Sequence, residues 1–451
     1  MSLGASRLKK RILALVVGLC SINLISCGGA SGTKQPPSGL HNRVLASQGV
    51  NTATSYPGLY ILNGYNDTIP RVSPIGAGAN PGLMAISPSR NIVTAFDSST
   101  NTVYAVNTIT EAGIGSVKLP GPSNSMVVPT SLPIGYAAVP SASVNDYSFT
   151  GALEAMNFSN NSLLTIAVPN AQTVVTNASG SQFLVFSNGS DSVTVVSAAS
   201  ASPPVDTSCL INPPNNVCTV VPGFDRPVNA IINGTTAYIF NCGAECGGVQ
   251  ASIQTLDLST LTAGVPLPVN GATYGLLQGS TLYVAGNGTP TGQTCASLTN
   301  PINPVTAATY CGTLDIVDLT SMTDPYFQNP ATEIAIPDGF HYQMDLTFNG
   351  QLFVGSRDCT NIGNATYPSG EVRGCLAIYN LNTNTLVIPP ENGDVNGLQG
   401  FTTRYIEYVA QGGSLDVYDT TRDILLINDY LPEGTINVVG YIGDVKAVDF
   451  F

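Results

Sequence analysis

The polar residues best suited to chemistry gather in two short stretches that resemble each other. The first is "GFDRP" at 223–227, and the second is "DGFHYQ" at 338–343. Acids, a guanidinium, an imidazole and a phenol in one place could form a mixed-charge pocket for a polar ligand. Further charged residues follow the second stretch. The candidate ligand-binding residues are Asp225, Arg226, Asp338, His341, Tyr342, Arg357, Asp358, Glu371 and Arg373.

A plainer interpretation of these residues is that they hold turns together. Arg226 and the nearby acids could pair across turns, since Arg–carboxylate pairs are common structural devices. We favour this structural interpretation, and we keep the ligand pocket as the alternative.

Signatures of catalysis or of a metal site are scarce. The sequence has two His, at 41 and 341, and neither G-x-S-x-G nor H-E-x-x-H occurs. "CGAEC" at 242–246 has C-x3-C spacing, with no second pair of matching spacing and no nearby His, which argues against structural zinc. We therefore predict no catalytic residue, no metal site and no cofactor.

Eight cysteines instead suggest disulfide bonds between sequence neighbours. An even number of cysteines in an exported chain is typical of a disulfide framework, although eight cysteines allow 105 connectivities. The predicted pairs are Cys209 with Cys218, Cys242 with Cys246, Cys295 with Cys311, and Cys359 with Cys375.

The first residues have the features of an export signal. A basic cluster at 7–11 precedes an apolar stretch at 12–25, which is too short to span a bilayer. The following "LISCG" at 24–28 resembles a bacterial lipoprotein lipobox. The resemblance implies a signal peptide at 1–26 and a lipid-modified Cys27, with the outer membrane favoured because Gly28 is not Asp. An ordinary secretory signal with a chance Cys is the alternative.

The amino-acid composition limits the classes of partner that the protein can bind. Charged residues make up 10% of the chain against a usual figure of roughly 25%, while hydrophobic residues make up 43%. Four of the 15 basic residues lie in the leader, which leaves 15 − 4 = 11 against 28 acids, or a charge of −17. Such a surface repels phosphate backbones, so we predict no nucleic-acid partner.

A couplet of apolar strands recurs along the rest of the chain. The second member includes "GLYILNG" from 58, "TLDIVDL" from 313 and "SLDVYDT" from 414, and it occurs eight times. Its sixth position is a short polar residue that can start a turn. The first member, such as "LYVAGN" from 282, also occurs eight times, the last being "VKAVDF" from 445. With a shorter apolar segment on either side, each unit has four strands, a to d.

The two ends of the chain complete each other. A c strand already stands at 58, before the first b strand, and no c strand follows the b strand predicted at 445–450. We therefore predict an all-β, single closed β-propeller at 58–451, in which the C-terminus supplies strands a and b and residues 58–75 supply c and d. Eight blades are counted, and seven remain possible. Residues 27–57 would form the lipidated tether and an N-terminal arm lying on the domain.

The couplet is similar to the repeats of YVTN/YncE-type (WD40-like) β-propellers, carried here by "LYVAGN", "AYIFN", "TLDIVDL" and "SLDVYDT". This degenerate resemblance implies the fold and says little about activity. Four b-to-c gaps are long, at 141–151, 243–251, 288–312 and 358–374. In a propeller these loops share one face with the d-to-a turns, and we predict that this disulfide-stapled face contacts the ligand.

Three functions remain open. The first is a non-enzymatic binding or scaffold module, lipid-anchored in the bacterial cell envelope, with a protein or glycan partner. The alternative is a propeller-type hydrolase or lactonase with an axial polar or metal site. The third is a structural envelope protein with no small ligand.

Overall fold

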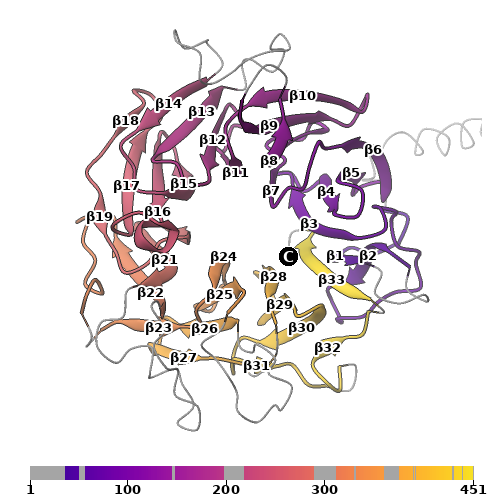
Figure 1. The fold of residues 1–451 in the computed structure, drawn as a ribbon. Helices are drawn as coiled ribbons and strands as arrows, with labels where there is room; N and C mark the ends of the chain where they lie inside the picture. The colour runs from indigo at the N-terminus through magenta and orange to yellow at the C-terminus, as the bar shows by residue number, and fades with distance from the viewer. Residues whose placement is uncertain are drawn as a thin grey trace, which may run out of the picture.

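The computed structural model has eight β-sheets arranged as the blades of a propeller around a central axis (Figure 1). The eight-bladed prediction is confirmed, and seven blades are excluded. The structure describes residues 36–49, 56–144, 148–197, 218–288, 311–329, 332–359, 375–389, 391, 393–428, 431–438 and 440–449. Cys27 and the predicted signal peptide lie outside these residues.

The first four blades follow each other along the chain, and each runs from the axis outward. The first blade is β3 (Pro81–Ile86), β4 (Ile92–Asp97), β5 (Thr102–Asn107) and β6 (Ala112–Lys118). The second is β7 (Ser125–Val127), β8 (Ile134–Ser143), β9 (Thr150–Asn157) and β10 (Ser162–Ala167). The third is β11 (Ala171–Thr176), β12 (Gln182–Ser187), β13 (Ser192–Ser197) and β14 (Cys218–Pro222). The fourth is β15 (Pro227–Asn233), β16 (Thr236–Asn241) and β17 (Ser252–Asp257), with an outer edge divided into β18 (Thr262–Ala263) and β19 (Leu267–Pro268).

The next three blades repeat this order. The fifth blade is β20 (Tyr274–Gln278), β21 (Thr281–Gly288), β22 (Cys311–Asp318) and β23 (Ile334–Ile336). The sixth is β24 (Phe340–Leu346), β25 (Gln351–Arg357), β26 (Leu376–Asn380) and β27 (Thr385–Val387). The seventh is β28 (Val395–Gly400), β29 (Ile406–Gln411) and β30 (Ser414–Asp419), with an outer edge divided into β31 (Ile424–Leu425) and β32 (Thr435–Ile436).

The eighth blade joins the two ends of the chain, but in a different division from the one predicted. Its order is β33 (Tyr441–Ala447), β1 (Arg43–Gly49) and β2 (Gly58–Asn63), and Ile75 bridges Leu59 at the outer edge. The C-terminus therefore supplies only strand a, and the prediction of a b strand at 445–450 is wrong. The prediction of an arm is also wrong for Arg43–Gly49, which is strand b. All seven residues of β1 are buried, because the strand lies between β2 and β33 and both of its faces are packed. Such a strand does not need alternating polar and apolar residues.

The polar residue at the sixth position has its predicted role in seven of the eight c strands, where its side chain accepts a hydrogen bond from a following backbone N–H group. Asn107 Oδ1 accepts hydrogen bonds from the backbone N–H groups of Ile109 and Thr110, at 2.9 and 3.0 Å. Asp257 Oδ1 accepts equivalent bonds from Ser259 and Thr260, at 2.7 and 3.1 Å. These side chains satisfy backbone donors that the c–d turn leaves free, so the repeat encodes its own turn.

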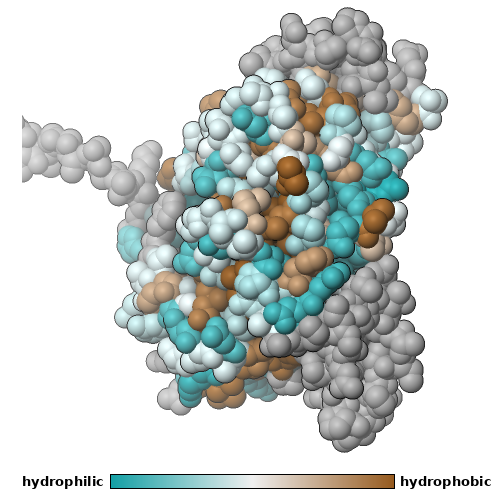
Figure 2. Space-filling model, turned by 90° about the vertical axis from the view of Figure 1, so that its left-hand side faces the viewer, coloured by the Kyte–Doolittle hydropathy of each residue, from teal (hydrophilic) through white to brown (hydrophobic). Residues whose placement is uncertain are grey.

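The apolar core lies between neighbouring blades. One cluster combines Phe96 and Val103 of the first blade with Val139 and Met156 of the second, all of them buried. Figure 2 shows the rim of the propeller, where apolar side chains are scattered among polar and weakly polar ones. No helix in the part of the chain that the structure describes is both long and apolar enough to span a bilayer.

Candidate functional site

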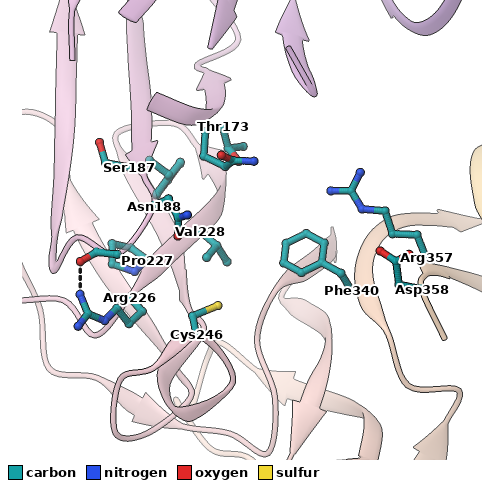
Figure 3. Close-up of a pocket in the computed structure, with 13 residues that line it drawn as sticks. Thr173, Ser187, Asn188, Arg226, Pro227, Val228, Cys246, Phe340, Arg357 and Asp358 are labelled. Atoms are coloured by element: carbon teal, nitrogen blue, oxygen red, sulfur yellow. Dashed lines mark hydrogen bonds between the residues drawn. The ribbon is translucent and has the colours of Figure 1, made fainter. Parts of the chain in front are cut away.

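One face of the propeller carries the b–c loops and the d–a turns, as expected from the alternating strand directions. A cavity of about 380 Å³ opens on this face, between the third, fourth and sixth blades (Figure 3). We call it the axial cavity. Its wall contains Gln172, Thr173, Phe186, Ser187, Asn188, Gly189, Arg226, Pro227, Val228, Cys246, Phe340, Arg357 and Asp358. Three of the predicted ligand residues, Arg226, Arg357 and Asp358, are among them.

A disulfide bond shapes one side of this cavity. Cys242 and Cys246 are bonded, with their Cα atoms 5.6 Å apart; Cys242 precedes the short 3₁₀ helix η2 (Gly243–Cys246), and Cys246 is its last residue. The turn ends at Gly247, whose φ of 80° suits a residue without a side chain. The bond therefore closes the b–c loop of the fourth blade, as predicted.

The other predicted disulfides are partly visible. Cys359 and Cys375 are bonded across the b–c loop of the sixth blade, at a Cα separation of 5.6 Å. Cys218 is disulfide-bonded as well, while Cys209, Cys295 and the side chain of Cys311 lie outside the described residues.

Asp225, in the d–a turn before β15, holds the disulfide-closed b–c loop of the fourth blade in place. We call this loop, residues 243–251, the stapled loop. Its carboxylate accepts hydrogen bonds from the backbone N–H groups of Val249, at 2.9 and 3.1 Å, and of Gln250, at 2.7 Å. The close approach requires Gly248, because a Cβ atom there would lie 1.9 Å from Asp225 Oδ1. The structural interpretation of Asp225 is thus supported by its contacts.

The guanidinium of Arg226 also contacts a neighbouring turn rather than the cavity. Its Nη1 donates to the carbonyl oxygen of Gly189 and lies 3.5 Å from a carboxylate oxygen of Asp191. Figure 3 shows the guanidinium turned away from the cavity toward this neighbouring turn. Arg226 therefore builds the wall and ties the third blade to the fourth.

Arg357 is arranged differently. Its guanidinium carbon lies 5.3 Å from the ring centre of Phe340 and 4.6 Å from that of Tyr342, which are cation–π distances. Phe340 is its direct cross-strand partner in the pairing of β24 with β25. The next residue, Asp358, donates its backbone N–H to Asp394 Oδ1 at 2.8 Å, which anchors the start of the loop.

Of the other predicted residues that the structure describes, Asp225, Asp338, His341 and Tyr342 are not part of the axial cavity wall. His341 is buried at 1% exposure, and its Nε2 donates to the carbonyl oxygen of Pro337 at 2.8 Å. Burial lowers the pKa of His341 to about 4, so the ring is neutral near pH 7. Tyr342 donates to Asn396 Oδ1 at 2.9 Å, and burial raises its pKa. Asp338 is also buried, and Glu371 and Arg373 lie outside the described residues.

A buried acid connects the stapled loop to the next blade. Glu245, in η2, accepts hydrogen bonds from the backbone N–H of Asn287 at 2.9 Å and from its side-chain amide at 3.1 Å. Burial raises the pKa of Glu245 to about 7, although both hydrogen bonds act in the opposite direction. In the described ranges no group of three or more His, Cys, Asp or Glu side chains is placed to hold a metal ion.

Several wall residues were not singled out from the sequence. Gln172, Thr173, Phe186 and Asn188 lie where an inner strand begins or a b strand ends, and Phe340 lies within the "DGFHYQ" stretch. Their shared signal is position, because the starts of a strands and the ends of b strands meet at the looped face of a propeller.

Comparisons with known proteins identify the fold and no family. No family model matches the chain, and no curated protein matches it in sequence. A structure titled Kuenenia stuttgartiensis hydrazine synthase aligns with a TM-score of 0.51 and 12% identity, covering 75% of this chain and 95% of that one. Dihydro-heme d1 dehydrogenase NirN in complex with DHE aligns with a TM-score of 0.58 and 12% identity, covering 91% of this chain and 75% of that one. At such identities the similarity establishes the propeller alone.

Proposed function

We propose that this protein is a lipid-anchored binding module of the bacterial cell envelope. It contacts its ligand through the looped face, which carries the b–c loops and the d–a turns. The observation that carries the proposal is the axial cavity of about 380 Å³, which lies within the range of roughly 300–1,000 Å³ usual for ligand sites. Its wall combines apolar side chains with a few polar groups, as binding sites commonly do. We propose a protein or glycan of the envelope as the ligand.

The proposed location follows from the leader sequence. Lipidation of Cys27 would place the propeller at a membrane surface, joined to it by the Gly-, Ser- and Pro-rich segment at 28–39. Two or more acyl chains hold a protein stably at a bilayer, whereas one gives marginal binding. The outer membrane is the proposed site, and the YVTN/YncE-like repeat is the proposed origin of the fold.

Partner capture in intact cells tests the binding function. Tagged, lipidated protein is cross-linked beside a variant in which the loops at 288–312 and 358–374 are shortened. We expect a partner that is captured by the full chain and lost from the shortened one. Capture of the same molecules by both variants, or of none, contradicts binding through this face.

Fractionation tests the proposed anchor separately. Cys27→Ser removes the acceptor of the lipid, so the protein should move from the membrane fraction to the soluble periplasmic fraction. A variant that stays with the membrane to the same extent as the wild type contradicts the lipid anchor. The hydrolase alternative predicts that a captured ligand is returned cleaved, which mass spectrometry of the released material detects.

A further inference from the structure

The protein has only 15 basic residues, and five of the nine that the structure describes form ion pairs with carboxylates. Ion pairs join Arg43 to Glu111 and Asp449, Arg226 to Asp191, Arg404 to Asp67, Arg422 to Asp419, and Lys446 to Asp444. Arg357 has no ion pair with any carboxylate of the described residues. In a chain with so few basic residues, a cation left without an acid at a cavity wall is a candidate anion receptor.

The aromatic contacts hold Arg357 ready for a ligand. Its cross-strand pairing with Phe340 and its stacking on Phe340 and Tyr342 restrict the side chain. Stacking uses the faces of the guanidinium, so the N–H groups along its edges stay available for hydrogen bonds. Figure 3 shows this group directed into the open space beyond the Phe340 ring.

The other residues of the cavity wall indicate which chemical groups the ligand carries besides its anionic group. Phe186, Pro227 and Val228 provide an apolar side, while Gln172 and Asn188 provide amide groups that both donate and accept hydrogen bonds. An apolar side next to amide groups suits a sugar ring, which has C–H faces and hydroxyl edges. The cavity has room for a ligand of this size.

The balance of charge favours a single carboxylate. The two oxygen atoms of a carboxylate match the paired N–H groups of one guanidinium, which gives a bidentate bond. Asp358 also belongs to the wall, and the acidic surface as a whole repels ligands with several negative charges. A singly charged sugar acid therefore fits better than a phosphorylated compound.

We infer that the axial cavity binds a uronic acid unit of a glycan, with its carboxylate held by Arg357 and its ring lying against Phe340. This inference rests on the proposed binding function and names its ligand class. It also assigns different roles to the two arginines of the wall, since Arg226 is structural and Arg357 contacts the ligand.

Calorimetric titration of the purified mature chain with methyl galacturonoside, a sugar acid with one carboxylate, and with the neutral methyl galactoside, tests the inference. We expect the acidic sugar to bind at least about tenfold more tightly than the neutral one, since a charge-assisted hydrogen bond commonly exceeds the 1.4 kcal/mol of a tenfold change. Arg357→Gln should lose that difference. Arg357→Lys should keep only part of it, because lysine retains the charge but not the paired donors.

A matched control is Arg422→Gln, which removes an exposed arginine that is not part of the cavity wall and should bind methyl galacturonoside like the wild type. Circular dichroism and melting temperature establish that each variant is folded. Equal binding of both sugars, unchanged in Arg357→Gln, overturns the role of Arg357 and leaves the binding function standing. Binding of neither sugar, with a partner still captured in cells, overturns the sugar-acid inference alone. Binding of neither sugar without any captured partner overturns both proposals.

Discussion

Arg43 contacts three elements where the ring closes, and its replacement tests how the two ends of the chain are joined. Its Nε and Nη2 donate to the two carboxylate oxygens of Asp449, at 3.0 and 2.8 Å, next to the C-terminal end of β33. Its Nη1 donates to Glu111 at 3.0 Å and to the carbonyl oxygen of Thr108, both in the first blade. One side chain thus links the eighth blade, the C-terminus and the first blade.

The expected cost of removing this cation follows from its burial. The side chains of Arg43, Glu111 and Asp449 are 8%, 6% and 22% exposed. Burial alone lowers the pKa of Arg43, but the hydrogen bonds and charges of Asp449 and Glu111 outweigh it and raise the pKa. Losing one partner of a buried ion pair costs roughly 3–5 kcal/mol, and the partial exposure of Asp449 places Arg43→Met near 3 kcal/mol.

Scanning calorimetry of the purified mature chain measures this effect. Unfolding entropy of about 2 cal/mol/K per residue converts 3 kcal/mol into a drop in melting temperature of roughly 3–4 °C for a propeller of this length. Arg422→Met is the control, because its side chain is 61% exposed and a surface ion pair contributes about 1 kcal/mol or less. Adding Glu111→Gln to Arg43→Met should recover part of the loss, since it removes a buried carboxylate that has lost its ion-pair partner.

Equal melting temperatures for Arg43→Met and Arg422→Met would refute this reasoning. A double variant that melts lower than Arg43→Met would show that Glu111 stabilises the structure through contacts other than its charge. The first outcome would mean that the ring is closed by the backbone pairing of β1 with β2 and β33 rather than by the buried ion pairs.

Three further predictions concern stability. Burial raises the pKa of Glu154 from 4.5 to about 7, against the hydrogen bond from Thr165, so this group stabilises the fold fully below about pH 4.5 and that contribution is lost as the pH rises through 7. Glu154→Gln should remove up to roughly 3 kcal/mol of this pH dependence, measured by urea unfolding between pH 4.5 and 8. Replacing Cys359 and Cys375 with Ser should cost about 3 kcal/mol, and replacing Cys242 and Cys246 about 2 kcal/mol, because the closed loops differ in sequence separation, 16 against 4; non-reducing urea unfolding compares them. Asp67→Asn should lower the melting temperature by about 3 °C, since Asp67 is buried and accepts hydrogen bonds from Arg404 and Tyr408.

The propeller was predictable because its repeat contains a turn signal that can be recognised from adjacent residues alone. Most c strands end in a polar residue that accepts hydrogen bonds from the following N–H groups, as Asn107 and Asp257 do, and this signal can be recognised without any knowledge of distant contacts. Strand β1 was missed for the opposite reason. Its residues, "RVLASQG", are all buried between two strands, so no alternation of polar and apolar residues distinguishes them.

The candidate site was predictable in position but not in role. Asp225 and Arg226 were placed on the correct face, yet their bonds to Val249, Gln250 and Gly189 depend on loops that meet only in the folded chain. The pairing of Phe340 with Arg357 lies closer to what a sequence can reveal, because both strands of their hairpin are apparent. An irregularity between His341 and Gln343 shifts the register, however, so a simple count outward from the turn misplaces the pair.

The contacts around the axial cavity explain why a binding role suits this face. Asp225, the Cys242–Cys246 bond and the bonds from Asn287 to Glu245 hold the stapled loop in place before any ligand arrives. A wall ordered in advance spares a ligand the entropy cost of ordering it, so fewer contacts suffice for a given affinity. Arg357 is then the group through which selectivity would arise, because the other polar groups named here are already engaged in supporting the wall.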